Sequence, residues 1–303
     1  MSLVINHNLM ASNVARNLSS SYKELATSTR RLSSGLRVGS AADDAAGLAV
    51  RELMRSDVTS LNQGVRNAND AISLIQTADG ALGVIDEKLI RMKELATQAA
   101  TGTYNSDQRL VIDSEYQAMA SEITRIASST DFNGIHLLNG NLSGENSAHD
   151  GSGLVSSGPM KVHFGTANDE NEDYYYINIG TSTAAALGVG LGAAYDSTTG
   201  DAGRSISTQE LAQQSLDALT TAIVSKDKVR ANLGALQNRL ENTITNLSIQ
   251  AENVQASESR ISDVDVATEM TQFTRNQILT QTAVSMLSQA NSMPRMAMQL
   301  IGG

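Results

Sequence analysis

The chain has 303 residues, a formal net charge of −10 at pH 7 and an aromatic content of only 3%, with two prolines, no cysteine and no tryptophan. The lack of cysteine excludes disulfide bonds, thiolate metal sites and a cysteine nucleophile. Because aromatic rings are scarce, alanine and aliphatic residues must form the core, which favours close packing of helices over a ring-filled globular core.

The first twenty residues are amphipathic and rich in asparagine and serine, without the apolar centre of a cleavable signal peptide. No apolar run approaches the roughly 18 residues that a membrane-spanning helix needs. We therefore expect neither a cleaved signal nor insertion into a membrane.

Two helical patterns fill the first hundred residues. The first predicts a helix over about residues 4–34 that ends near Gly35. The second predicts a helix from about residue 50 to 100, about 75 Å long at about 1.5 Å per residue. Apolar positions spaced by three and four mark both helices: Leu18, Tyr22, Leu25, Thr29, Leu32 and Leu36 in the first, and Met54, Val58, Leu61, Val65, Ala68, Ile72, Ile75, Leu82, Ile85, Leu89 and Met92 in the second.

A third helix and a strand pair are predicted in the middle of the chain. Asn105 and Gln108 form a capping pair for a helix that runs to about Ser129. Alternating apolar residues over 160–164 and 175–179 predict a β-hairpin whose loop is acidic. Residues 141–203 hold eight acidic side chains against Lys161, a net charge of −7, so we expect this segment to face solvent.

Two further helices are predicted towards the other end. Ser207 and Glu210 form a capping box for a helix that runs to about Gln255, and a last helix extends from about 262 to Pro294. Their apolar ladders are Leu233, Leu236, Leu240, Ile244, Leu247, Ala251, Val254 and Ile261, and Leu279, Ala283, Met286, Ala290, Met293, Ala297 and Leu300. Each ladder of the N-terminal half thus has a candidate partner in the C-terminal half, which predicts a mainly α fold of long antiparallel helices.

A row of amides accompanies the first of these C-terminal ladders, at Asn238, Asn242, Asn246, Gln250 and Asn253. Such amides either fix the register against a partner, as buried amides do in coiled coils, or form an uncharged solvated face. The sequence leaves both interpretations open.

Signatures of chemistry are missing from the sequence. The four histidines are scattered, and neither an HExxH motif, a phosphate-binding GxxxxGK[ST] loop nor a GxSxG elbow occurs. We therefore expect no catalytic residue, no metal and no cofactor, and the acidic balance argues against nucleic-acid binding.

Several motifs in order along the chain resemble bacterial flagellin. They are Arg31-Leu-Ser-Ser-Gly-Leu-Arg37, residues 40–47 (SAADDAAG) and Arg66-Asn-Ala-Asn-Asp70 in the first half, and Leu233-Gly-Ala-Leu-Gln-Asn-Arg239, Thr243-Ile-Thr-Asn-Leu247, Glu258-Ser-Arg-Ile261, Ala267-Thr-Glu269 and Ser288-Gln-Ala-Asn291 in the second. About 230 of the 303 residues are covered by this resemblance.

The resemblance implies a terminal helical domain of residues 1–43 and 262–303 that lines a filament core. It also implies a rod-like helical domain of residues 44–261, in which 141–203 supply the β-hairpin and loops, without large outer domains. We expect Leu18, Leu25, Leu32, Leu36, Leu279, Met286, Met293 and Leu300 to pack in the core of the polymer.

By the same resemblance the chain is a subunit of the extracellular flagellar filament that serves swimming motility, exported by the type III route without signal cleavage. The implied partners are identical subunits, the filament cap, the hook-junction proteins and a cytoplasmic export chaperone on the C-terminal helices. Arg91, Leu95, Gln98 and Glu115 match positions through which the vertebrate toll-like flagellin receptor senses flagellins.

Two other functions are weighed against the filament subunit. A hook-filament junction protein would share the terminal helices, but the complete motifs and the compact middle segment favour the filament subunit. An enzymatic flagellin would carry a hydrolase in its middle, which the short insert and the missing HExxH motif oppose.

Overall fold

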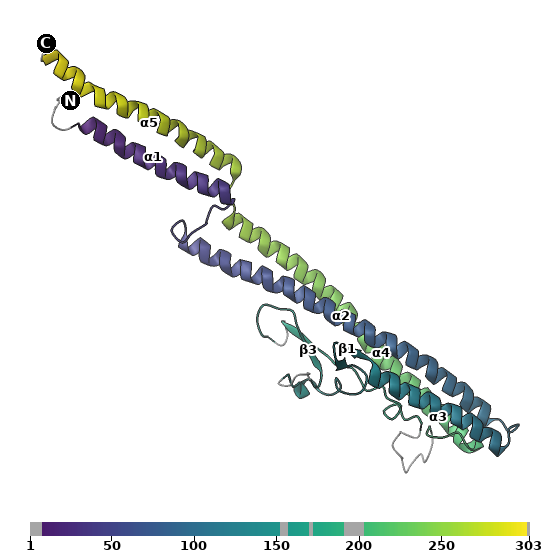
Figure 1. The fold of residues 1–303 in the computed structure, drawn as a ribbon. Helices are drawn as coiled ribbons and strands as arrows, with labels where there is room; N and C mark the ends of the chain where they lie inside the picture. The colour runs from purple at the N-terminus through teal and green to yellow at the C-terminus, as the bar shows by residue number, and fades with distance from the viewer. Residues whose placement is uncertain (1–7, 152–156, 170–171, 191–202, 302–303) are drawn as a thin grey trace. The chain divides into compact units, whose positions relative to one another are not determined.

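The computed structural model describes residues 8–151, 157–169, 172–190 and 203–301, with side chains left out at 147 and 297–301. The described residues form five α-helices, four short strands and one 3₁₀ turn (Figure 1). These elements are α1 (Leu9–Ser34), α2 (Ala45–Ala100), α3 (Ser106–Ser129), β1 (Asp131–Phe132), β2 (Ile135–His136), η1 (Asn146–Ala148), β3 (Met160–His163), β4 (Tyr174–Ile177), α4 (Gln209–Ser262) and α5 (Val266–Ile301). Long helices from both halves of the chain with a small β-hairpin region confirm the predicted fold class.

The chain divides into two compact units, which we call the terminal unit (1–58 with 252–303) and the rod unit (59–251). One boundary between the units falls inside α2 and the other inside α4. The sequence instead places the two boundaries near residues 43 and 262. The predicted division of the chain at those residues stays a prediction.

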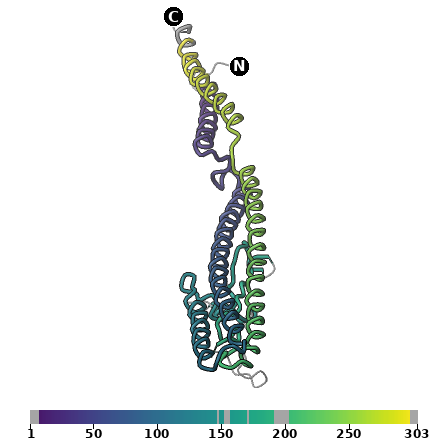
Figure 2. The backbone as a smooth tube through the Cα atoms, turned by 90° about the vertical axis from the view of Figure 1, so that its right-hand side faces the viewer, coloured from purple at the N-terminus to yellow at the C-terminus, as the bar shows by residue number. Residues whose placement is uncertain are grey.

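In the terminal unit, α1 and α5 lie side by side (Figures 1 and 2). The Asn8 side chain caps α1 by accepting a hydrogen bond from the Ala11 amide. Helix α1 ends at Gly35, which has a left-handed φ of 73° and donates its amide to the Arg31 carbonyl. Asp265 caps α5 by accepting from the amides of Ala267 and Thr268, and these bonds lower the pKa of its carboxyl.

The segment that follows α1 and the segment that joins α4 to α5 are held together by backbone hydrogen bonds. The Arg37 amide donates to the Ser262 carbonyl at 2.7 Å, and the Val264 amide donates to the Gly35 carbonyl at 3.0 Å. Leu36 and Asp263 thereby form an isolated antiparallel bridge. The segments before α2 and after α4 are thus tied to each other although more than two hundred residues separate them.

The rod unit has an apolar core between α2, α3, α4 and the hairpin. Its largest fully buried side chains include Leu74, Ile75, Leu82, Ile85, Leu89, Met92 and Leu95 of α2, Tyr116 and Ile123 of α3, and Leu137 and Leu138 after β2. The spacing of the α2 residues follows the predicted ladder. Burying each large side chain contributes about 1.5–3 kcal/mol, so this unit carries its own stabilisation.

Ion pairs join α2 to α4 beside this core. The Lys226 ammonium is 1% exposed and lies 2.5 Å from Asp86 and 2.7 Å from Asp227. The Arg230 guanidinium donates to both oxygens of Asp79, at 2.7 and 3.1 Å, and these bonds lower the pKa of that carboxyl. These antiparallel contacts fix α4 along α2.

The hairpin region follows the predicted pattern. Strands β3 and β4 pair antiparallel with Lys161 opposite Tyr176, and a tight turn with positive φ at Asn133 (52°) and Gly134 (80°) joins β1 to β2. The end of β3 approaches α2 so closely that a Cβ on Gly64 would lie 2.0 Å from the Phe164 carbonyl oxygen. Glycine is therefore required at that position for the hairpin to reach the helix.

The structure confirms the capping pair of Asn105 and Gln108 at α3. The predicted capping box at Ser207 is wrong, because the Leu211 amide donates to the Thr208 hydroxyl and α4 begins one residue later. The predicted stop at about Gln255 is also wrong, since α4 continues to Ser262. Residues 4–7 of the first predicted helix lie outside the described residues.

The prediction that the last helix ends at Pro294 is wrong, because α5 continues through this proline to Ile301. Proline lacks the amide that would bond the carbonyl four residues earlier, which belongs to Ala290. The Asn8 side-chain amide donates to that carbonyl at 2.8 Å instead. The N-cap residue of the neighbouring helix thus supplies the hydrogen bond that Pro294 cannot make.

Candidate assembly surface

The less exposed positions of α1 and α5 recur at spacings of three and four and define what we call the α1–α5 seam. Its members are Ala11, Val14, Leu18, Ser21, Leu25, Ser28 and Leu32 of α1, and Glu269, Phe273, Asn276, Thr280, Ala283, Leu287 and Ala290 of α5. Half of the α5 positions before Ala290 carry polar side chains. The seam is therefore much more polar than the core of the rod unit.

Polar side chains form contacts along this seam. The Arg31 guanidinium lies 3.6 Å from the Glu269 carboxylate, and the Thr280 hydroxyl donates to the Asn276 carbonyl on its own helix at 2.7 Å. A polar hollow of about 280 Å³ lies between the two helices, and Lys23, Glu24, Thr27, Ser28, Arg31, Glu269, Gln272 and Asn276 line it. Water competes well for such groups, so these polar contacts contribute little stability.

The apolar side chains of this helix pair are largely on its outside. Exposed large apolar residues are Leu9, Met10 and Tyr22 on α1, and Val266, Met270, Ile278, Leu279, Val284, Met286 and Met296 on α5. We call these ten residues the outer apolar face. Part of it surrounds a shallow hollow of about 550 Å³ on α5 that Met270, Ile278 and Leu279 line together with Thr271, Thr274 and Arg275.

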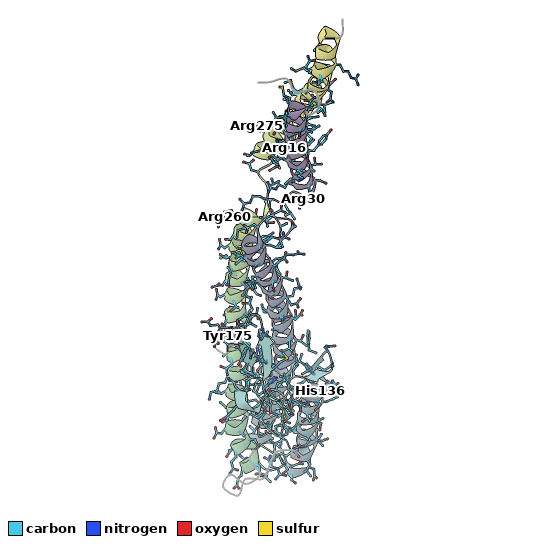
Figure 3. The ribbon with its side chains drawn as sticks, turned by 90° about the vertical axis from the view of Figure 1, so that its left-hand side faces the viewer. Arg16, Arg30, His136, Tyr175, Arg260 and Arg275 are labelled. Carbon is cyan, nitrogen blue, oxygen red and sulfur yellow. The ribbon has the colours of Figure 1, made fainter. Side chains whose placement is uncertain are left out.

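The side chains that project around the pair can be followed in Figure 3, with Arg16 and Arg30 on α1 and Arg275 on α5. Exposed apolar residues that lie together, as Met270, Ile278 and Leu279 do around the hollow on α5, mark a surface for association. The outer apolar face is therefore the candidate assembly surface.

The residues that the sequence assigns to the polymer core divide between the seam and the outer face. Leu18, Leu25 and Leu32 lie in the seam, Leu36 is half-buried in the connector, and Met293 is half-buried on α5. Leu279 and Met286 are 47% and 51% exposed on the outer face. The side chain of Leu300 lies outside the described part of the chain.

The sequence ladder was out of phase with the seam at two places. On α1, the ladder includes Tyr22 and Thr29, whereas the seam uses the adjacent Ser21 and Ser28. On α5, the sequence ladder misses Glu269, Phe273, Asn276, Thr280 and Leu287. Their spacing in steps of three, four and seven residues was the available signal, but three of the five are polar, and a pattern of apolar positions does not include those.

The four candidate receptor residues lie on α2 and α3 of the rod unit. The Arg91 guanidinium donates to Glu115 at 2.8 and 3.1 Å and to Glu94 at 3.0 Å. The bonds to Glu115 raise the pKa of Arg91. The Gln98 amide donates to the Tyr104 hydroxyl instead, and Leu95 is only 1% exposed. The structure thus brings Arg91 and Glu115 together at the surface and places Leu95 in the core.

The amide row on α4 is exposed along its whole length, including Asn238, Asn242 and Asn246. It borders a hollow of about 740 Å³ next to the hairpin, where the Arg239 guanidinium stacks 3.5 Å above the ring of Tyr175. These amides form a solvated face within one chain.

Within the described ranges, no cluster of three or more histidine, aspartate or glutamate side chains could hold a metal ion. A search of the same residues finds no helix that is both long and apolar enough to cross a membrane.

Comparison with known proteins identifies both halves of the chain. Residues 5–143 match the bacterial flagellin N-terminal helical region, and residues 216–301 match the bacterial flagellin C-terminal helical region.

Relatives match over almost the whole length. Flagellin FlaB1 of Treponema pallidum (strain Nichols) is 40% identical over 293 residues, which are 96% of this chain and 96% of that protein. Flagellin of Bacillus subtilis (strain 168) is 39% identical over 309 aligned residues, covering 98% of this chain and 99% of the relative.

Among solved structures, a putative flagellar hook-associated protein from Vibrio parahaemolyticus aligns with a TM-score of 0.54 over 73% of this chain and 100% of that chain. At 14% identity this likeness concerns the fold alone. Two matching helical regions in the correct order, together with full-length relatives near 40% identity, show that the chain belongs to the bacterial flagellin family.

Proposed function

We propose that the chain is a structural subunit that self-assembles into the extracellular helical filament of the bacterial flagellum and thereby serves swimming motility. The outer apolar face on α5 is the observation that carries this proposal. Its side chains are only partly covered by the described residues of the same chain, and further copies of the chain would supply the remaining cover.

The free energy of association comes from burying this face. A half-exposed leucine or methionine still exposes apolar surface that a neighbouring copy can bury. Burial stabilises the complex by about 25 cal/mol per Å² of apolar surface. Leu279 and Met286 are two turns apart on α5 and are the members that the sequence assigns to the polymer core. Their exposure in the single chain supports a role in packing between copies.

The experiment replaces Leu279 and Met286 together by glutamate and follows seeded polymerisation of the purified full-length chain by sedimentation and electron microscopy. Because both side chains are exposed, the substitutions leave the fold of the monomer intact but bury charges in the polymer. We expect filaments from the parent chain and none from Leu279→Glu/Met286→Glu.

The matched control is Gln281→Glu, which adds a charge at another exposed position of the same helix. It should polymerise like the parent chain. Normal filaments from the double variant, with unchanged far-ultraviolet circular dichroism, would reject the outer apolar face as the assembly surface.

The same face accounts for the other partners that the family resemblance implies. Exposed apolar residues such as Met270 and Ile278 need cover before assembly, which a cytoplasmic export chaperone on the C-terminal helices would provide. The filament cap and the hook-junction proteins would cover the same surfaces at the two ends of a filament. Export would proceed without a cleaved signal peptide.

A second proposed role is recognition by the vertebrate toll-like flagellin receptor through Arg91, Gln98 and Glu115. The exposed Arg91–Glu115 pair supports this role, because it joins α2 and α3 and presents both charges at the surface. Leu95 is enclosed by the core and would act by holding α2 in place.

Receptor-reporter signalling by soluble monomer tests this role. Arg91→Ala and Glu115→Ala should each reduce signalling at least several-fold. The control is Arg125→Ala, which removes an equally exposed ion pair with Glu122 on α3. Equal signalling by all three variants would contradict the assignment.

A further inference from the structure

The spacing of the α1–α5 seam allows more than one alignment of its two helices. Seam positions recur every seven residues on both α1 and α5, as with Ser21 and Ser28 or Asn276 and Ala283. A shift of one helix by seven residues, about 10 Å at about 1.5 Å per residue, again places seam positions opposite seam positions. Spacing alone therefore does not define the register.

One specific contact lies near the connector end of the pair. Glu269 is the single acidic residue between Val266 and Ile301, and its carboxylate is nearly buried beside Arg31. A shift by seven residues would place Arg31 near Ser262 or Asn276 and bring Glu269 opposite Glu24 or Val38 in place of its partner Arg31. A buried carboxylate without a partner is strongly unfavourable.

A second specific contact lies near the other end. The Asn8 side-chain amide donates to the Ala290 carbonyl, the one that Pro294 leaves without its helical donor. At other seam positions of α5, the helix's own amides occupy the carbonyls. Pro294 thus marks one carbonyl of α5 as an acceptor for α1.

The two contacts agree on the alignment. From Asn8 to Arg31 the chain advances 23 residues along α1, and from Ala290 back to Glu269 it retreats 21 residues along α5. The bridge between Leu36 and Asp263 follows the same antiparallel alignment. Its backbone bonds do not depend on side-chain identity, whereas the other two contacts do.

We propose that the pair Arg31–Glu269 and the contact of Asn8 with the Ala290 carbonyl, freed by Pro294, set the register of α1 against α5. The residues of both contacts are positioning residues. This proposal rests on the proposed function, because the register decides how Tyr22 of α1 and Leu279 of α5 are arranged relative to each other on the outer apolar face. A subunit in the shifted register would present a different face to its neighbours.

The test measures the register directly in filaments. The chain has no cysteine, so Ser33→Cys and Ser285→Cys, at exposed positions of α1 and α5 that are far apart along the helix axis, give a specific pair of spin-label sites. Labelled subunits are diluted into unlabelled parent subunits before polymerisation, and electron–electron double resonance gives the distance distribution between the labels. A shift by seven residues changes this distance by about 10 Å.

Three substitutions remove the contacts selectively. Asn8→Asp keeps the acceptor that caps α1 but removes the donor to Ala290, and Pro294→Ala restores an amide that competes for the same carbonyl. Glu269→Gln removes the charge that Arg31 pairs with. Pro294→Ala improves the helix itself, so a loss of register in this variant cannot be ascribed to a weaker α5.

The parent should give one narrow distance. Asn8→Asp/Glu269→Gln and Pro294→Ala/Glu269→Gln should each add a second population, displaced by about 10 Å and amounting to at least a third of the molecules. The control Asn13→Asp/Glu252→Gln changes an asparagine and a glutamate at exposed positions outside the two proposed contacts and should keep the parent distance.

A single parent-like distance in both double variants would overturn the register proposal while leaving the filament function intact. Failure of the labelled parent and of the unlabelled chain to polymerise would overturn the proposed function and, with it, this inference.

Discussion

The terminal unit and the rod unit distribute polar and apolar side chains in opposite ways. In the rod unit, Leu82, Leu89 and Ile123 are buried and the ion pairs lie beside them. In the α1–α5 pair, Ser28 and Asn276 are buried while Leu279 is exposed. The first arrangement stabilises a single chain, and the second gains its stabilisation from neighbouring copies.

The largest expected effect separates these two kinds of leucine. Leu89→Ala, in the rod core, should lower the free energy of unfolding of the monomer by about 2–5 kcal/mol. Leu279→Ala should change it by less than about 0.5 kcal/mol yet raise the concentration needed for polymerisation. Urea unfolding followed by circular dichroism measures the first quantity, and sedimentation of filaments the second.

Equal losses of monomer stability in Leu89→Ala and Leu279→Ala would remove the contrast between the two units.

A second prediction concerns the close approach of the hairpin to α2. Gly64→Ala places a methyl group against the Phe164 carbonyl oxygen and should destabilise the rod unit by about 1–3 kcal/mol. Gly80→Ala is the matched control on the same helix, because its methyl group meets no atom within 4 Å. It should stabilise the unit by about 0.5–1 kcal/mol, so thermal unfolding should shift in opposite directions.

The ion pairs between α2 and α4 provide a smaller and asymmetric effect. Asp86→Ala leaves the buried Lys226 ammonium with Asp227 alone and should cost about 1–2 kcal/mol. Lys226→Met removes the buried charge and leaves a partly hydrated Asp86, so we expect a cost below about 1 kcal/mol. Chemical unfolding of both variants measures the difference, and a greater loss in Lys226→Met would contradict this account.

The smallest expected effect is the acid response of one carboxylate in each unit. Hydrogen bonds from Arg30 and Ser40 lower the pKa of Asp43 to about 2, and those from Arg230 lower the pKa of Asp79. A lowered pKa in the folded state means that the stabilising contribution is complete above the ordinary value of 3.8. It is lost as pH falls from there through the folded value.

Carbon-detected NMR titration of the aspartate carboxyls should therefore show Asp43 ionised well below pH 3.8. The variant Arg30→Gln should raise the midpoint of Asp43 towards 3.8 without moving that of Asp79. An unchanged Asp43 midpoint in this variant would rule out Arg30 as the main cause.

Sequence patterns predicted the rod unit well because its apolar residues are inside. The ladder from Leu61 to Met92, the caps at Asn105 and the two strands of the hairpin all follow rules that relate period and polarity to burial. Those rules assume that one chain buries its own apolar side chains.

The same rules were less successful in the α1–α5 pair for a physical reason. The apolar pattern favours Tyr22 over Ser21 and Leu279 over Thr280, because it places an apolar residue against the partner helix. In an assembling chain, part of the apolar residues is retained for other copies, and the seam mixes polar with apolar residues at spacings of three and four. The helix through Pro294 could not be foreseen, since the donor that compensates it is Asn8, more than 280 residues away.

The polar seam has a consequence for when the chain ends become ordered. Hydroxyl groups, amides and one ion pair exchange their partners for water at little net cost, so the polar half of the seam adds little to the free energy that holds α1 against α5. The outer apolar face gains free energy only when another copy covers it, and that gain grows with the number of copies present. Order at the two ends is therefore governed by mass action, as a property of the population of subunits rather than of any one chain.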